Sequence, residues 1–301
     1  MKPEKIVVIG SSNTDMVVQS GHLPSPGETV LGGKFMMNPG GKGANQAVAA
    51  ATLGGDVSFI TKVGSDVFGR EALKGFQSNG IDTAYVTIDK DSPSGVALIM
   101  VDEQGENCIS VALGANAAMQ MSEIEKARDV IKQASFLLIQ LEIPMEVVAY
   151  AVQLAKQEGT KVVLNPAPAQ VLPDDLLSSL HIITPNETET AFLTGVKVET
   201  EATARQAARI LKNKGVNIVV ITRGEQGAYV LSDEEDQAVP CPKVKAVDTT
   251  AAGDTFNGAL VVGLSEGMTL MAAIVFANKA AAYSVTKMGA QASVPSRKDI
   301  Y

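Results

Sequence analysis

Residues 136–165, FLLIQLEIPMEVVAYAVQLAKQEGTKVVLN, contain a complete strand–helix–strand unit. The short apolar runs Phe136–Gln140 and Val162–Leu164 predict buried strands, and the longer segment Pro144–Gln157 between them predicts a helix. Further strands are predicted at Ile182–Thr184 and Ile218–Thr222, with helices at Asn186–Thr194 and Ala202–Lys214. Apolar strands that alternate with helices form parallel sheets covered on both faces. The sequence therefore predicts an α/β fold, a three-layer sandwich with a mainly parallel central sheet flanked by helices.

The first third of the chain begins in the same way and then changes pattern. Strands are predicted at Ile6–Ile9 and Val57–Val63, with helices at Ala44–Leu53 and Phe68–Ser78 and a loop at SSNTD. Residues 94–113 instead read as two β runs around Asp102–Gly105, which predicts a hairpin. With the run Thr29–Met37, this hairpin is expected to form a separate small sheet. We therefore expect one domain over residues 1–301 with a β-sheet lid from about 12–40 and 94–114.

Composition excludes several classes of function. The formal net charge of −8 argues against nucleic-acid binding through phosphate neutralisation. No apolar run reaches membrane-spanning length, and MKPEKIVVIG leads straight into a strand, which favours a cytoplasmic protein. Cys108 and Cys241 lie outside any CxxC pair and are expected to be free, buried or half-buried thiols. Since His22 and His181 are the only histidines, a histidine-based zinc site or a Ser-His-Asp hydrolase is disfavoured.

Polar side chains follow four of the predicted strands directly. These residues are Glu142, Asn165, Asn186 and Thr222. In open parallel sheets, ligands bind outside the carboxyl ends of the strands. The sequence therefore predicts an active site at this edge of the sheet.

The stretch DTTAAGDTFNG, Asp248–Gly258, carries the strongest chemical signal. Its small residues leave backbone N–H groups uncovered at the start of a helix, where anions bind. Asp254 beside such a nest has the character of a base that takes a proton from an attacking hydroxyl group. The amides of Ala251, Ala252 and Gly253 would then hold the charge that develops on a phosphate. An ordinary helix cap with an acidic residue nearby has the same appearance.

Two polar clusters in the first fifty residues suit the hydroxyl groups of a sugar. NPGGKGANQA, residues 38–47, lacks both the Walker and the dinucleotide-binding glycine patterns, but it brings Lys42 and Asn45 to a helix start. A tight loop before a helix would also explain its glycines. Asn13 and Asp15 are two residues apart and could bind adjacent hydroxyls, although an Asx-turn gives the same spacing.

Two further motifs suit a nucleotide. In PNETE, residues 185–189, a carboxylate at a helix start could reach a hydrated magnesium ion. A capping arrangement between Asn186 and Glu189 is the competing interpretation, and both can hold together. In TRGEQG, residues 222–227, glycines permit a close backbone approach to a nucleotide, as they would in any strand–turn–strand connection.

These motifs together resemble the ribokinase branch of the ribokinase/PfkB carbohydrate kinase family. The similarity runs from SSNTD, residues 11–15, to GAQASVP, residues 289–295, and includes NPAPA and TPNETE. It implies an α/β domain with a small β lid that closes over a sugar and often forms the dimer contact. The bare edge strands of such a lid would promote aggregation, so we expect a homodimer that covers them.

The resemblance also implies a role for individual residues. Asp254 would be the catalytic base and Ala251, Ala252 and Gly253 the anion hole. The sugar would be held by Asn13, Asp15, Gly41, Lys42, Asn45, Glu142 and Asp254 itself. The nucleotide site would contain Asn186, Thr222, Gly224, Gly227, Gly253 and Asn278. Glu189 would act on Mg²⁺ through water. An activating monovalent cation, usually K⁺, would lie at Asp248, Thr250, Ser284, Lys287, Gly289 and Ser293, mostly through backbone carbonyl groups.

The implied reaction is ATP-dependent phosphorylation of D-ribose at O5. Fructose, a deoxyribose or another pentose, or a nucleoside are alternative acceptors, and a non-catalytic sugar sensor is the rival from another class. A nucleoside would need aromatic stacking surface, yet the lid segments carry only Phe35, which favours a bare sugar. A sensor has no use for a base such as Asp254.

Overall fold

The computed structural model describes residues 4–300 and contains a nine-stranded central sheet. The strand order is β13-β12-β11-β10-β9-β8-β1-β4-β5. The bounds are β1 Lys5–Ile9, β4 Asp56–Gly64, β5 Val86–Asp89, β8 Phe136–Ile139, β9 Lys161–Leu164, β10 Ile182–Ile183, β11 Ile218–Thr222, β12 Ala228–Leu231 and β13 Asp236–Val239. The strands from β11 to β5 are parallel, and β12 and β13 continue the sheet antiparallel. The predicted mainly parallel sheet is confirmed.

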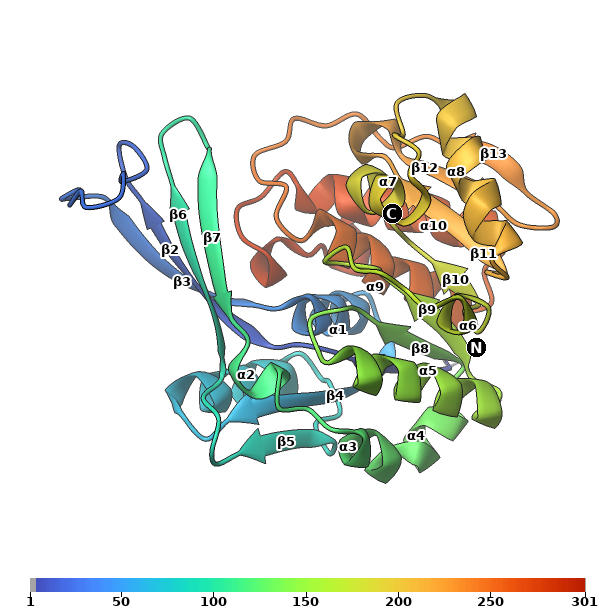
Figure 1. Ribbon diagram of the computed structural model, residues 1–301, viewed down its shortest axis with the longest axis horizontal. Coiled ribbons are helices and arrows are strands. Elements are labelled where there is room, and N and C mark those ends of the chain that lie inside the picture. Colours follow the sequence, from blue (N-terminus) through green and yellow to red (C-terminus); the bar gives the residue numbers. More distant parts are fainter. Residues whose placement is uncertain (1–3, 301) are drawn as a thin grey trace.

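Helices cover both faces of this sheet (Figure 1). They are α1 Lys42–Thr52, α2 Val67–Ser78, α3 Met121–Lys126, α4 Arg128–Gln133, α5 Met145–Glu158, α6 Asp174–Leu177, α7 Glu187–Thr194, α8 Glu201–Asn213, α9 Ala252–Ser265 and α10 Leu270–Ser284. Successive side chains of a strand point to opposite faces. In β1, Ile6 and Val8 accordingly pack in the core with α1, α2, α9 and α10, whereas Val7 and Ile9 pack in the core with α3 to α6 and α8.

Helices α1 and α9 pack closely because of one glycine. A Cβ atom at Gly258 would lie 2.7 Å from the Cβ of Ala49 and 2.8 Å from the backbone nitrogen of Ala50. Real Cβ atoms do not approach neighbours so closely, so any other residue at this position would push the two helices apart. No helix within residues 4–300 has the length and apolar character needed to cross a membrane.

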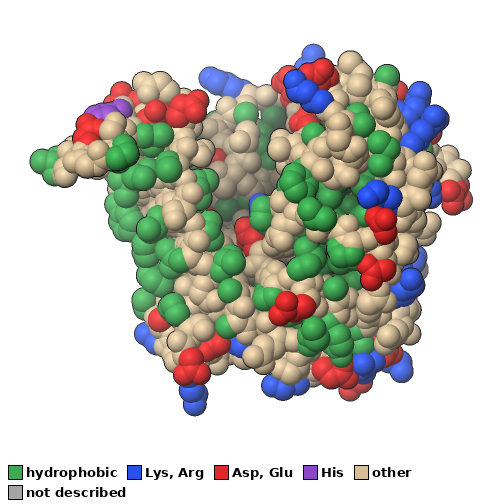
Figure 2. All heavy atoms as spheres, viewed as in Figure 1, with side chains coloured by type: hydrophobic (Ala, Val, Ile, Leu, Met, Phe, Trp, Pro, Cys, Tyr) green, Lys and Arg blue, Asp and Glu red, His purple; other side chains and the backbone are tan. Residues whose placement is uncertain are grey.

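The lid is a four-stranded sheet in the order β3-β2-β6-β7. Its strands are β2 Asn13–Gln19, β3 Lys34–Gly40, β6 Gly95–Val101 and β7 Asn107–Ala112. The chain passes between the lid and the body four times, at Ser12–Asn13, Gly40–Gly41, Ser94–Gly95 and Gly114–Asn116, and we call this region the lid junction. The lid stands away from the body in Figure 1, and Figure 2 shows a hollow between the two.

Three expectations about the lid were wrong in detail. The SSNTD stretch is not a loop throughout, because Asn13–Gln19 is a strand that pairs with β3 on one side and β6 on the other. Strand β3 begins at Lys34 rather than near Thr29, after Gly32 and Gly33, which both have positive φ. Cys108 is exposed on β7, whereas Cys241 is half-buried. All three errors have one cause: outside the lid junction, the residues of β2, β3 and β7 are half-buried or exposed on both faces, so these strands lack the buried apolar pattern used to predict strands and burial.

Candidate active site

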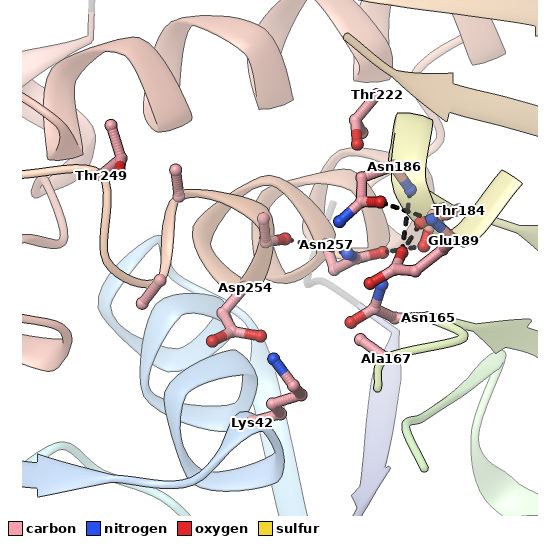
Figure 3. A pocket seen from close by; sticks show the side chains of 13 residues that line it. Lys42, Asn165, Ala167, Thr184, Asn186, Glu189, Thr222, Thr249, Asp254 and Asn257 are labelled. Carbon is pink, nitrogen blue, oxygen red and sulfur yellow. Dashed lines mark hydrogen bonds between the residues drawn. The ribbon is translucent and has the colours of Figure 1, made fainter. Parts of the chain in front are cut away.

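A pocket of about 160 Å³ lies at the predicted edge of the sheet (Figure 3). It is lined by Lys42, Asn165, Ala167, Thr184, Asn186, Glu189, Thr222, Thr249, Ala251, Ala252, Gly253, Asp254 and Asn257. Three of the four polar residues predicted to follow strands line it. Residues more than 200 positions apart, such as Lys42 and Asp254, point toward one another across it.

The start of α1 is fixed by backbone contacts that need glycine. Gly41 has φ +89°, and a Cβ there would lie 2.7 Å from the backbone nitrogen of Asn13. A Cβ at Gly43 would lie 2.6 Å from the backbone of Gly10. The helix start therefore presses against the chain that enters the lid. Here the carboxylate of Glu142 accepts hydrogen bonds from the backbone nitrogen of Lys42, at 3.0 Å, and from the hydroxyl of Ser11, at 2.6 Å.

Asp254 lies in the first turn of α9, which begins at Ala252. Ala251 caps the helix in the left-handed conformation, with φ +57°. The first N–H groups of a helix have no partner within it. The N–H group of Ala252 donates outside the helix, to the backbone oxygen of Thr249 at 3.3 Å, so the N–H groups of Gly253 and Asp254 are the ones that this helix start can offer to an anion. The Asp254 side chain is 7% exposed and accepts hydrogen bonds from Asn45 Nδ2 at 3.0 Å and Gln46 Nε2 at 2.9 Å.

The charges of this site influence one another. Burial raises the pKa of Asp254 above its ordinary value, and the positive charge of Lys42 and the amide donors of Gln46 and Asn45 oppose the rise. Burial alone would lower the pKa of Lys42, but Asp254, Glu142 and further carboxylates outweigh it and raise that pKa overall. Lys42 is therefore a stable cation beside a carboxylate that takes up protons more readily than an exposed aspartate.

Asp15 is a second carboxylate whose pKa is raised by its surroundings. Burial, with the negative charges of Glu142 and Asp254, raises the pKa of Asp15 from 3.8 to about 6, while Lys42 opposes the rise. Because the folded pKa exceeds the unfolded one, the folded chain binds more protons between about pH 4 and pH 6. The free energy of unfolding therefore falls as the pH rises through this window, by at most roughly 3 kcal/mol.

A network of amide side chains joins the two helices to the ends of β9 and β10. Gln46 donates to Asp254 and also to Asn165, at 3.0 Å, and Asn165 Nδ2 donates to the backbone oxygen of Thr184 at 3.2 Å. The Thr184 hydroxyl donates to Asn257 Oδ1 at 2.6 Å, and Asn257 Nδ2 donates to the backbone oxygen of Gly253 at 2.8 Å. This series of hydrogen bonds therefore ends at Gly253, the residue before Asp254, and holds the Asp254 carboxylate in one orientation.

On the other side of the pocket, both interpretations of PNETE fit the structure. Asn186 and Glu189 form a reciprocal capping box at the start of α7, with both hydrogen bonds at 2.8 Å. Glu189 is 8% exposed and lines the pocket, and burial raises its pKa. Within residues 4–300 there is no cluster of three or more metal-binding side chains. The donor set suits Mg²⁺, which keeps several waters and needs only one or two carboxylates.

The other residues expected at the nucleotide lie in different surroundings. Thr222, at the end of β11, lines the pocket, and Gly224 begins the turn that follows. Gly227 has φ +84°, and a Cβ there would lie 2.1 Å from the backbone oxygen of Val239. Asn278 is buried on α10 and donates to the backbone oxygens of Val239 and Pro240, at 3.2 and 3.3 Å. Asn278 therefore fixes the segment after β13 and does not line the pocket.

Of the residues expected around a monovalent cation, four lie in loops beside α9 and α10: Asp248, Thr250, Lys287 and Gly289. Ser284 is the last residue of α10, and Ser293 ends a short 3₁₀ helix. Asp248 joins the two loops, because it accepts hydrogen bonds from the backbone nitrogens of Thr250 at 2.9 Å and Gly289 at 2.8 Å. The hydroxyls of Ser284 and Ser293 donate to backbone oxygens within their own turns. The ammonium group of Lys287 lies 4.6 Å from the ring centre of Tyr283. These contacts leave backbone carbonyl groups as the main cation ligands that the loops can offer.

Comparison with known proteins identifies the family. The profile of pfkB family carbohydrate kinases matches residues 3–297. The chain belongs to this family. It is 46% identical to the ribokinase of Haemophilus influenzae over 294 residues, which are 98% of this chain and 96% of that one. It is 39% identical to the deoxyribokinase of Salmonella typhi over 292 residues, 97% of this chain and 95% of that one. The structure of Arabidopsis thaliana ribokinase complexed with ribose and ATP matches with a TM-score of 0.92 and 33% identity, covering 100% of this chain and 98% of that chain.

Several site residues of this pfkB-family chain were missed in the sequence. Gln46 directly follows Asn45 in the glycine-rich motif, and Asn257 lies one helical turn after Asp254, so helical spacing could have revealed both. Gln140, which directly follows β8, donates a hydrogen bond to Oε1 of Gln46 at 2.6 Å. Asn116 contacts Ser12 and Asn13, more than 100 positions away, and no local pattern announces such a contact.

Proposed function

We propose that this chain catalyses ATP-dependent phosphorylation of D-ribose at O5. The observation that carries the proposal is the buried carboxylate of Asp254, held by two amide donors beside Lys42 and directly after the open helix start at Ala251–Gly253. A sensor would gain nothing from a desolvated base at an anion-binding nest. Family membership and relatives named ribokinase at up to 46% identity support a sugar as the acceptor.

In the proposed mechanism, Asp254 accepts the proton of the sugar hydroxyl as this oxygen attacks the γ-phosphorus of ATP in line. The bond between the γ-phosphorus and the oxygen that bridges it to the β-phosphate breaks, and ADP leaves with that oxygen. Asn45 and Gln46 hold the carboxylate in place for this transfer. The amides after Ala251 and the charge of Lys42 stabilise the negative charge on the phosphoryl group. Bound Mg²⁺ would neutralise phosphate charge, and Glu189 is the residue that would hold it through water. Asn186, Thr222, Gly224, Gly227 and Asn278 are proposed to form or support the nucleotide site.

Asn13, Asp15, Gly41, Lys42, Asn45 and Glu142 are proposed to hold the sugar. Asp15 and Asn38 are opposite one another on β2 and β3, on one face of the lid. The hollow in Figure 2 separates the lid from the body that carries Asp254. Closure of the lid over this hollow would exclude water from the transferred phosphoryl group.

The proposal is tested by ADP release from Mg-ATP with D-ribose, 2-deoxyribose, fructose or adenosine as acceptor. Each acceptor is measured with K⁺ and with a large organic cation in its place. We expect turnover on ribose that increases with K⁺, because Asp248 and Gly289 bring the cation loops together beside α9. 2-Deoxyribose is the second candidate acceptor, since a deoxyribokinase is 39% identical to this chain. Ribose binding without ADP release from any acceptor would instead favour the sensor.

We further propose that the lid forms a homodimer contact. Strand register places Val18, Phe35, Met37, Leu98 and Met100 on the lid face opposite to Asp15, and all five are exposed. Figure 2 shows a continuous patch of hydrophobic side chains over the outer side of the lid. Exposed apolar patches of this kind mark protein interfaces. Sedimentation at micromolar concentration should give a dimer, and Leu98→Lys should give monomers.

A further inference from the structure

The side chain of Asn116 is buried, 1% exposed, at the point where the chain leaves the lid. Its Oδ1 accepts a hydrogen bond from the backbone nitrogen of Ser12 at 2.9 Å. Its Nδ2 donates to the backbone oxygen of Ser12 at 3.1 Å and to Oδ1 of Asn13 at 2.8 Å. An asparagine amide has two N–H donors, and both are used here. Asn116 therefore joins the segment that leaves the lid to the segment that enters it.

These contacts determine which way the amide of Asn13 faces. Because Asn116 presents a donor, the Asn13 atom that faces it is the oxygen. Within residues 4–300, Nδ2 of Asn13 donates to no protein group, and it is not among the buried unpartnered atoms, so it is open to solvent. Asp15 projects from the same face of the strand two residues on. Asn13 thus offers hydrogen-bond donors on this face of the strand, whereas the ionised carboxylate of Asp15 beside it offers only hydrogen-bond acceptors.

The backbone encloses this pair of side chains. A Cβ at Gly95 would lie 2.1 Å from Oδ1 of Asn13 and 2.3 Å from Nδ2 of Asn116. Asn13 is paired with Gly40 on one side and with Gly95 on the other. All four chain crossings of the lid junction therefore meet around Asn13. The partner at position 116 therefore sets the orientation of this amide.

We infer that Asn116 is a positioning residue for the acceptor sugar, because it fixes Asn13 as a hydrogen-bond donor beside the acceptor Asp15. Such a pair recognises two adjacent hydroxyl groups, of which one accepts from Asn13 and the other donates to Asp15. The inference rests on the proposed function, and it adds a specificity determinant that acts through Asn13.

Asn116→Asp tests this directly. The new carboxylate can only accept hydrogen bonds, so the amide of Asn13 turns its N–H groups toward it and presents its oxygen to the sugar. We expect the dissociation constant of ribose, measured by calorimetry, to rise about tenfold or more, as for a lost and reversed hydrogen bond. The kcat at saturating ribose and the KM for ATP should change less than about twofold. Asn107→Asp, which adds the same charge at an exposed lid position, is the matched control and should bind ribose as the wild type does.

A double-mutant cycle separates positioning from general loss of structure. In an Asn13→Ala background there is no amide to orient, so Asn116→Asp should weaken ribose binding no further. Asn116→Ala serves the same cycle if the aspartate variant does not fold. A folded variant that binds ribose normally, or effects that multiply in the double variant, would overturn the inference. If the wild type releases ADP with another sugar and not with ribose, the proposed acceptor fails, and the same cycle measured with that sugar still decides the role of Asn116.

Discussion

Replacing Asp254 with asparagine tests the catalytic assignment most directly. The change keeps the shape of the side chain but removes its charge and its ability to accept a proton. One of the two hydrogen bonds, from Asn45 Nδ2 at 3.0 Å or from Gln46 Nε2 at 2.9 Å, is lost because an amide has only one oxygen. That loss is offset by the removal of a buried charge, since burial raises the pKa of Asp254. The fold should therefore tolerate the substitution.

The rate should fall much more than the stability. General-base help contributes about 10²–10⁴-fold, so kcat should fall by at least about 10²-fold, equivalent to roughly 2.7 kcal/mol in the barrier. ADP release at saturating ribose and ATP measures this, and calorimetry should show ribose affinity within a few-fold of wild type. Because the pKa of Asp254 is raised, kcat of the wild type should decline with acid at a pH above the ordinary aspartate value.

The control for this experiment is Asp129→Asn, an equal change of charge at an exposed position of α4. It should leave turnover unchanged. A folded Asp254→Asn protein that keeps turnover within about threefold of wild type would refute the assignment of Asp254 as the base.

Three more substitutions probe the surroundings of the site. Asp15→Asn should remove the fall in the free energy of unfolding between about pH 4 and pH 6. Urea unfolding at pH 7.5 should therefore show the variant more stable than the wild type by up to roughly 3 kcal/mol, with little difference at pH 4. Equal differences at both pH values would contradict this. Gln46→Glu replaces a hydrogen-bond donor 2.9 Å from the Asp254 carboxylate with a second negative charge, so the pKa of Asp254 should rise further. The decline of kcat in acid should therefore move to higher pH by about one unit or more. An unchanged pH profile of kcat would show that this contact plays no part in catalysis. Asp248→Ala breaks the link between the two loops expected to hold the cation, so the ratio of turnover in K⁺ to turnover in a large organic cation should fall toward one, and an unchanged ratio would place the cation elsewhere.

The central sheet was predictable because its signals are local. Strands such as β8 and β9 are apolar on both faces and end at polar residues, so both the strand and the site edge can be read from a few consecutive residues. The motif around Asp254 was equally readable, since small residues before a helix have a direct chemical meaning. The helix that follows the glycine-rich motif was predicted to begin at Ala44, and α1 begins instead at Lys42.

The rest of the site depends on contacts between distant residues. Asn116 lies 104 positions from Ser12, and Gln46 lies 119 positions from Asn165. The first pair forms when the lid places β2 beside β6, and the second when the central sheet places β9 beside β8 and β1; a single sequence does not contain either order. The prediction of the lid strand β2 failed for a different reason. Beyond Asn13 its residues are mostly half-buried on both faces, so its side chains lack the alternation of buried apolar and exposed polar residues that predicts a strand.

The packing of Gly258 of α9 against α1 has a consequence for how this protein can diversify. The helix that carries Asp254 and the helix that carries Lys42 and Asn45 form one block, locked where no side chain fits between them. The lid, in contrast, is joined to this block through the lid junction around Asn13. Mutations in the lid can therefore alter which acceptor is held without shifting the groups that transfer phosphate. A single fold of this construction can acquire new substrates by changes in one small, peripheral sheet while its chemistry is inherited intact.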